Sequence, residues 1–266
     1  MMVKILRIFF LACMVVPVVL YSIRIQEYGR EDKKLEQVGE LMERCVKDMP
    51  EELPAAHESS GPDKNGAGHS EILSYLNERD FVDVMELRKT NPDVDGVLRV
   101  DGTDMDYPVM YTEDMEYYIH RDFYGQESAY GSIFMDSISE AGCPNKILYG
   151  HHMRNGAMFG NLEQYAEDAY AQEHAVIKYI SDEKIELYRA AAVFNVSAEH
   201  EGLLNSLPMY YESQVEDLNR IIKECQGTVY DALEPGEDYI SLVTCEYTHP
   251  HGRCLVIGKK IAELQR

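Results

Sequence analysis

The sequence predicts a mainly β domain, a sandwich or a barrel, preceded by helices and interrupted by one further helix. Three observations indicate this fold class. After residue 93 the chain consists of short apolar or alternating runs separated by turn residues. Over residues 31–49 and 71–89, apolar residues instead recur at helical spacing, as on one face of a helix. That helical spacing returns once, over residues 210–226.

The first 25 residues contain an apolar segment. Residues 8–23 read IFFLACMVVPVVLYSI, carry no charge and follow Lys4 and Arg7. With the apolar residues around those charges, about 20 residues are long enough to cross a bilayer. A cleaved signal peptide is the alternative, but no small-residue cleavage site follows the run. We therefore predict an uncleaved single-pass anchor over residues 1–25, with the rest of the chain outside the cell.

Helices and a linker are predicted between this anchor and the strands. Residues 31–49 form an amphipathic pattern typical of a stalk helix. Residues 50–69 are rich in Pro, Gly, Ser and Asp and indicate a linker or loop. A second helical stretch covers residues 71–89. The predicted division is an anchor (1–25), a helical stalk with a linker (26–70) and a main domain (71–266).

The strands of the main domain are short. Examples are GVLRV (96–100), DYPVMY (106–111), GSIFMD (131–136), NKILYG (145–150), AVIKYI (175–180), KIELYRAAAVFNV (184–196), DYISLVT (238–244) and RCLVIGKKI (253–261). In the interrupting helix, the apolar residues of one face are Val215, Leu218, Ile221, Ile222 and Cys225, and Gly227 is expected to end the helix.

Charge and cysteine content exclude several functions. A net charge of −22 and a pI near 4.7 argue against binding to nucleic acid, or to an anionic membrane surface, through the main domain. The six cysteines form no CxxC pair and have no regular spacing, so a disulfide framework has weak support and a CxxC-type zinc site has none. They are Cys13, Cys45, Cys143, Cys225, Cys245 and Cys254.

Cys245 is a candidate nucleophile. It ends the apolar run 240–245, and Arg253 opens the next apolar run after a polar loop. Only a thiolate is nucleophilic, and a nearby cation lowers the pKa of a thiol or stabilises an oxyanion. Taken alone, a cysteine in a strand is more often a small core residue.

His151 is a candidate acid and base, because it follows the run 145–150 and imidazole exchanges protons near neutral pH. An isolated histidine in a loop is more often structural or solvated. His151 and His152 are adjacent, so at most one of them is expected to face a common site. His249 and His251 lie close to Cys245 but have no recognised ligand spacing, and no metal site is predicted.

Together these features resemble the sortase family. The family pattern TLxTC reads Ser241-Leu242-Val243-Thr244-Cys245 here, with a conservative change at its first position. Further segments resemble class B sortases: Asn91–Asp93, Asp101–Thr103, Asp106–Val109, Asp122–Gly125, Gly131–Asp136, Tyr149–His152 and Asn155–Phe159. The resemblance covers about Phe81 to Ile261. It implies a sortase-type β-barrel with N-terminal helices and an extra helix before the cysteine-bearing strand, which makes residues 71–266 the catalytic domain.

One departure concerns packing rather than chemistry. Class B relatives often carry a tryptophan after the glycine that follows Asn-Pro-Asp, whereas this chain has Val97 and contains no tryptophan. The loop between Cys245 and Arg253 is rich in His and Thr, which leaves substrate contacts there open.

The resemblance also implies a mechanism. Cys245 would attack the threonine carbonyl of a C-terminal sorting motif, of the NPxTx kind, and form a thioacyl intermediate. His151, chosen over His152 because it directly follows the family's glycine, would protonate the leaving amine and deprotonate the incoming one. Arg253 would stabilise the oxyanion. The implied partners are surface proteins with a sorting signal, an amine of the cell wall or of another surface protein, and the membrane. No cofactor and no metal are expected.

Three alternatives stay open. The first is a pilin-polymerising sortase, in which a pilin lysine is the acceptor. The second is a surface cysteine peptidase, which would cleave without an added amine. The third is a non-catalytic binding domain in which Cys245 is a core residue.

Overall fold

The computed structural model describes residues 2–50, 56–58, 69–140, 143–197, 200, 202–246 and 252–266. Within these ranges the side chains of residues 2–14, 56–58, 69, 140, 245 and 246 are left out of the description. The chain divides into two compact units, Met1–Glu40 and Leu41–Arg266.

The first unit is a helix, α1 (Met2–Arg44), which continues through Pro17 and into the second unit. The predicted stalk helix is therefore the C-terminal part of one continuous helix. Across the residues that the structure describes, no helix combines the length and apolarity needed to span a membrane. The side chains of residues 8–14, the first part of the predicted run 8–23, lie outside the described residues. The anchor therefore stays a prediction.

The helical stretch predicted over residues 71–89 is in fact three short helices, α2 (His69–Ser74), η1 (Glu78–Phe81) and α3 (Val84–Thr90). A short polar side chain caps the N-terminus of η1, and another caps that of α3. The Asn77 side chain accepts a hydrogen bond from the Arg79 N–H, and the Asp83 side chain accepts one from the Glu86 N–H. Such N-caps satisfy donors that a helix start leaves free, so they favour several short helices over one long helix.

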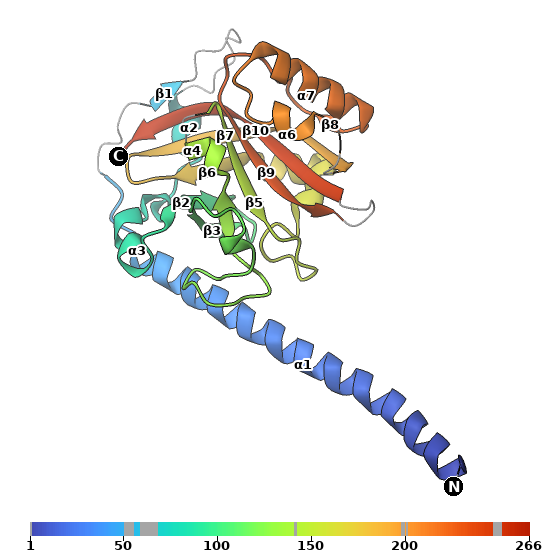
Figure 1. Cartoon of the computed structure of the whole chain (residues 1–266). Helices are drawn as coiled ribbons and strands as arrows, with labels where there is room; N and C mark the ends of the chain where they lie inside the picture. The colour runs from blue at the N-terminus through green and yellow to red at the C-terminus, as the bar shows by residue number, and fades with distance from the viewer. Residues whose placement is uncertain are drawn as a thin grey trace. The chain divides into compact units, whose positions relative to one another are not determined.

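The second unit is built on a closed eight-stranded barrel (Figure 1). Its order is β10-β9-β5-β4-β3-β2-β6-β7, and β7 pairs with β10 to close the ring. The strands are β2 (Val94–Arg99), β3 (Asp106–Met110), β4 (Ile133–Met135), β5 (Asn145–Gly150), β6 (Val176–Ile180), β7 (Lys184–Ser197), β9 (Tyr239–Glu246) and β10 (Gly252–Gln265). Each coincides with one of the predicted runs, so the barrel is confirmed.

Two additional strands lie at the edges of the barrel. β1 (Ala56–Glu58) pairs with the end of β10, inside the segment predicted to be a linker. β8 (Thr228–Val229) pairs with β7. The remaining residues of the predicted linker, 51–55 and 59–68, lie outside the described residues.

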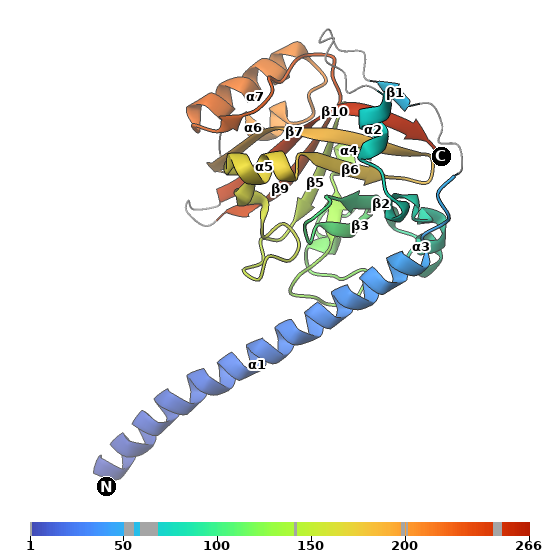
Figure 2. The same ribbon diagram turned by 180° about the vertical axis from the view of Figure 1, so that it is seen from behind.

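Several short helices occupy the loops: η2 (Tyr117–Ile119), α4 (Ser137–Glu140), η3 (Leu162–Ala166), α5 (Asp168–Glu173) and α6 (Leu203–Ser206). The longest helix of the second unit is α7 (Glu212–Glu224), which precedes the strand β9 as predicted. It lies across the outer face of the barrel (Figures 1 and 2).

The predicted apolar face of α7 is the face that packs on the barrel. Val215, Leu218, Ile221 and Ile222 are at most 1% exposed and share one core cluster with Phe194 of β7, Val243 of β9 and Leu255 of β10. Burying each such side chain contributes about 1.5–3 kcal/mol. This packing fixes one wall beside the ends of β9 and β10.

The end of α7 differs from the expectation for Gly227. The residue with positive φ is Gln226, at 56°, and the Gly227 N–H bonds to the Ile222 carbonyl at 2.8 Å, as in a Schellman motif. Gly227 is needed for a different reason: a Cβ there would lie 2.6 Å from Phe194 Cβ. Close approach of the helix end to β7 therefore requires the glycine.

Candidate active site

The ends of three neighbouring strands bring the predicted site residues together. β5 runs parallel to β9, with Gly150 opposite Thr244, and β10 runs antiparallel to β9, with Arg253 directly opposite Cys245. His151 follows Gly150, one residue beyond the paired part of β5. The backbones of His151, Cys245 and Arg253 therefore lie at the same end of three adjacent strands. The side chain of Cys245 and residues 247–251 are outside the description.

His151 is half-buried, and its carbonyl accepts a hydrogen bond from the Phe159 N–H at 3.0 Å. Its pKa lies below the ordinary histidine value, first because burial disfavours the charged ring and second because His120 is close. The imidazole is thus held in its neutral form at neutral pH and can accept a proton.

The loop after His151 folds back on itself. His152 pairs with Met158 in an isolated bridge, and its ring Nε2 lies 2.9 Å from the Gly160 carbonyl. The Met158 N–H donates to the hydroxyl of Tyr107 on β3 at 3.0 Å. The ring of His152 is therefore engaged within its own loop.

Arg253 is half-buried at the start of β10, and its Nη1 donates to the Gly252 carbonyl at 3.0 Å. Tyr149 of β5 lies nearby: burial raises the pKa of its phenol most, Asp136 raises it further, and the charge of Arg253 lowers it. The Tyr149 hydroxyl donates to Asp136 Oδ2 at 3.0 Å. The Tyr149 phenol is therefore hydrogen-bonded to a carboxylate and is also influenced by the charge of Arg253.

His120 was not among the residues singled out from the sequence. It follows η2, and its ring centroid lies 6.0 Å from that of His151, with 67° between the planes. The available signal was its place just before Asp122–Gly125, one of the class B segments, but nothing local connects it to His151.

In the described part of the chain, no group of three or more His, Cys, Asp or Glu side chains is arranged to hold a metal ion.

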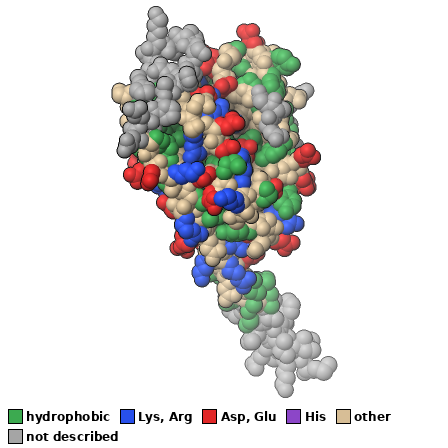
Figure 3. Space-filling view, turned by 90° about the vertical axis from the view of Figure 1, so that its left-hand side faces the viewer, with side chains coloured by type: hydrophobic (Ala, Val, Ile, Leu, Met, Phe, Trp, Pro, Cys, Tyr) green, Lys and Arg blue, Asp and Glu red, His purple; other side chains and the backbone are tan. Residues whose placement is uncertain are grey.

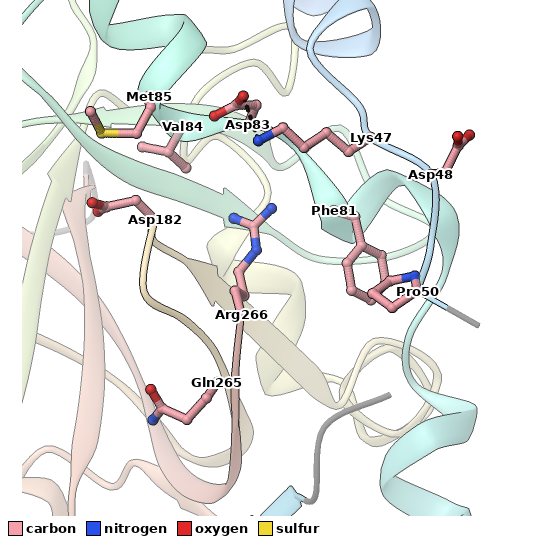
Figure 4. A pocket seen from close by; sticks show the side chains of 10 residues that line it. All are labelled: Lys47, Asp48, Pro50, Phe81, Asp83, Val84, Met85, Asp182, Gln265 and Arg266. Atoms are coloured by element: carbon pink, nitrogen blue, oxygen red, sulfur yellow. Dashed lines mark ion pairs between the residues drawn. The ribbon is translucent and has the colours of Figure 1, made fainter. Parts of the chain in front are cut away.

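A cavity of about 320 Å³ lies elsewhere, where β10 ends at the C-terminus (Figure 4). Its lining residues are Lys47, Asp48, Pro50, Phe81, Asp83, Val84, Met85, Asp182, Gln265 and Arg266. Two of these residues, Lys47 and Asp83, form an ion pair of 2.7 Å (Figure 4). Because Arg253 opens β10 and Arg266 follows its end, this cavity is separate from the candidate active site.

Known proteins share this architecture. The sortase domain family matches residues 98–261, which hold all three predicted site residues. A sortase B of Listeria monocytogenes is 27% identical over 189 residues, which cover 68% of this chain and 75% of that protein.

Solved structures agree with the sequence relatives. The crystal structure of Clostridium perfringens sortase B has a TM-score of 0.58 and 26% identity, covering 66% of this chain and 98% of that one. A sortase B structure from Bacillus anthracis has a TM-score of 0.64 over 91% of this chain and all of that one; at 20% identity it shows likeness of fold.

Proposed function

This chain belongs to the sortase family of transpeptidases, in its class B, and from that premise we propose that it acts through a cysteine nucleophile, Cys245. His151 is the general acid and base, and Arg253 stabilises the oxyanion. The donor is a surface protein with a C-terminal sorting motif of the NPxTx kind. The acceptor is an amine of the cell wall or of another surface protein.

The strand register carries this proposal. Arg253 is the residue directly across from Cys245, and His151 extends β5 beside the strand that carries Cys245. A nucleophile, a proton carrier and a cation on three adjacent strand ends form the set that acyl transfer through a thioester needs.

The first half of the reaction breaks the peptide bond. His151, neutral in the free enzyme, takes the proton of the Cys245 thiol as the sulfur attacks the threonine carbonyl carbon. A C–S bond forms, and the oxygen takes the negative charge beside Arg253. When the intermediate collapses, the C–N bond breaks and His151 in its protonated form gives its proton to the leaving amine. A thioester and a free amine result.

The second half forms the new peptide bond. His151, now neutral, takes a proton from the incoming amine as that amine attacks the thioester carbonyl. The C–S bond then breaks, and the departing Cys245 sulfur takes that proton back from His151. Both groups return to their neutral forms, so the cycle needs no cofactor.

A peptide assay tests the proposal. The chain from about Arg30 onward is incubated with NPxTx-type peptides, with and without an amine, and products are followed by mass spectrometry. We expect a thioacyl adduct on Cys245 and an amine-dependent product. Cys245→Ala abolishes both, His151→Ala lowers the rate by about 10²–10⁴, and Arg253→Ala lowers it by about 10²–10³.

Matched controls and alternatives accompany this assay. Cys225→Ala removes a half-buried cysteine that follows α7 and is expected to leave the rate unchanged. Cleavage that is indifferent to amine would identify a peptidase, and transfer only to a pilin lysine would identify a pilin polymerase. A chain that forms no adduct and is indifferent to all three substitutions would refute the proposal.

We also propose that residues 1–25 anchor the enzyme at the cell membrane as a single span, with the catalytic domain outside the cell. The uncharged run 8–23 and the basic Lys4 and Arg7 support this placement. In cell fractionation, the full chain should sediment with membranes and a chain starting at residue 26 should not. Equal partition of the two chains would contradict the anchor.

A further inference from the structure

His120 adjoins the proposed acid and base from a separate part of the chain. The two ring centroids are 6.0 Å apart and the planes meet at 67°, an edge-to-face arrangement within the range favoured by aromatic pairs. His120 is exposed, whereas His151 is half-buried. The inference that follows rests on the function proposed above for His151.

The loop that carries His120 is firmly held. The Asn91 side chain donates to the Tyr118 hydroxyl at 3.0 Å and to the Phe123 carbonyl at 2.7 Å, so it joins both sides of the loop. The Tyr118 hydroxyl in turn donates to Asp93 Oδ2 at 2.7 Å. The Asn-Pro-Asp segment therefore fixes the position of this loop.

Two further bonds hold the residues next to the ring. The Ser128 N–H donates to the carbonyl of His120 itself at 3.0 Å, and the Ser132 hydroxyl donates to the Arg121 carbonyl at 2.8 Å. Because His151 is held separately through Phe159, the contact between the rings joins two independently anchored segments.

We propose that His120 is a positioning residue for the transpeptidase: its ring orients the imidazole of His151, and its charge opposes protonation of His151. The contact thereby helps to keep the half-buried ring of His151 neutral.

The electrostatic reason is repulsion between like charges. Two imidazolium rings at this separation repel each other, and the more exposed ring is better solvated in its charged form. Both burial and His120 lower the pKa of His151, so His151 stays neutral down to a lower pH than an isolated histidine.

Other charged groups lie on the segments that carry the two rings or adjoin them. The Arg121 guanidinium lies 4.7 Å from the centre of the Tyr117 ring and donates to the Gly125 carbonyl. From β10, Arg253 acts on Tyr149, and from β9 the side chains of Cys245 and Glu246 lie outside the description. The exposed Arg154 lies in the loop that follows His151.

Three substitutions in the full chain separate the effect of the charge from that of the ring. His120→Phe keeps an aromatic ring and removes the charge. His120→Lys keeps a cation and removes the ring. His120→Ala removes both. The matched control is His174→Phe. His174 directly follows α5, and its ring is hydrogen-bonded to the Asp101 carbonyl.

The readouts are the NMR titration of His151, assigned with His151→Gln, and the pH profile of kcat/KM for amine-dependent transfer. With Phe or Ala at position 120, the His151 titration and the corresponding limb of the profile should move to higher pH. With Lys at position 120, the His151 titration and that limb of the profile should stay at the same pH or move to lower pH. With Ala or Lys, which both lack the ring, kcat at the optimum should also fall, because the ring support is lost.

Two outcomes of these measurements would refute the role proposed for His120. A His151 titration that is the same in wild type, His120→Phe and His120→Lys would refute it, as would an equal shift in His174→Phe. The NMR titration needs no catalysis. A chain that shows the expected titration shifts but transfers no peptide would therefore refute the proposed function and leave the coupling of the two rings established.

Discussion

Gly150 shows how one residue positions the proposed acid and base. It ends β5 immediately before His151, and a Cβ at this position would lie 2.4 Å from Ile133 Cδ1 and 2.8 Å from Phe159 Cδ2. Phe159 is also the residue whose N–H holds the His151 carbonyl. The absent side chain thus lets the returning loop pack on the strand end and fix His151.

Gly150→Ala should therefore affect both stability and activity. Overpacking at a buried site costs about 1–3 kcal/mol, and displacement of Phe159 should move His151 and lower kcat/KM. Urea unfolding and the peptide assay measure the two effects. As a control, Gly39→Ala in α1 meets no atom within 4 Å and should be neutral or slightly stabilising. Wild-type activity in Gly150→Ala would show that the loop does not depend on this contact.

At the scale of elements, α7 and the loop over residues 151–160 border the strand ends in different ways. The helix is held by apolar packing on β7, β9 and β10. The loop is held by hydrogen bonds, from Phe159 to His151 and from Met158 to Tyr107. Both depend on the barrel beneath them, since short helices and loops are marginal alone.

Ile221→Ala tests how much the helix contributes. Ile221 is fully buried in the cluster between α7 and the barrel, and its truncation should cost about 2–5 kcal/mol in the free energy of unfolding. Leu204→Ala, at a side chain of α6 that is 66% exposed, is the control and should stay within about 0.5 kcal/mol of wild type. Equal effects of the two changes would mean that α7 is not part of the cooperative core.

At the scale of the whole molecule, charge is organised in two ways. Acidic residues outnumber basic ones by 47 to 25, yet on the face shown in Figure 3 Lys and Arg lie among Asp and Glu. Inside, ion pairs connect strands across the barrel. Glu186 of β7 meets Lys146 of β5 at 3.0 Å and Lys260 of β10 at 3.2 Å, with Lys184 at 3.0 Å.

This buried cluster predicts how stability depends on pH. Burial alone would raise the pKa of Glu186, but the three lysines outweigh it and lower that pKa to about 2. A lowered pKa means that the carboxylate stabilises the fold above its unfolded pKa, and that this contribution is lost as pH falls toward 2. The shift corresponds to about 3 kcal/mol at neutral pH.

Glu186→Gln should accordingly be less stable than wild type by about that amount at pH 7. The difference should shrink between about pH 4.5 and pH 2, where wild type also loses the charge. Urea unfolding across this range measures the difference. A deficit that is constant with pH would mean that packing, and not charge, accounts for the effect.

Sequence patterns predicted the barrel strands and the helix α7, and the resemblance to sortases assigned the roles of the three proposed catalytic residues. The alternation of apolar and polar residues in strands and the three- and four-residue spacing of apolar residues in α7 are local properties. They can therefore be recognised in each segment by itself. The break of residues 71–89 into three helices was missed, although the Asn77 and Asp83 caps lie within it. The strand β1 was missed because only its pairing with β10 makes it a strand.

Tertiary structure decided which segments are neighbours. The parallel pairing of β5 with β9 puts His151 beside the strand of Cys245, and no apolar pattern specifies that pairing. The contact between His120 and His151 likewise arises only when the loop held by Asn91 meets the end of β5. The physical reason is that periodicity is set within a segment, whereas register and barrel closure are set by hydrogen bonds and packing between segments distant in the chain.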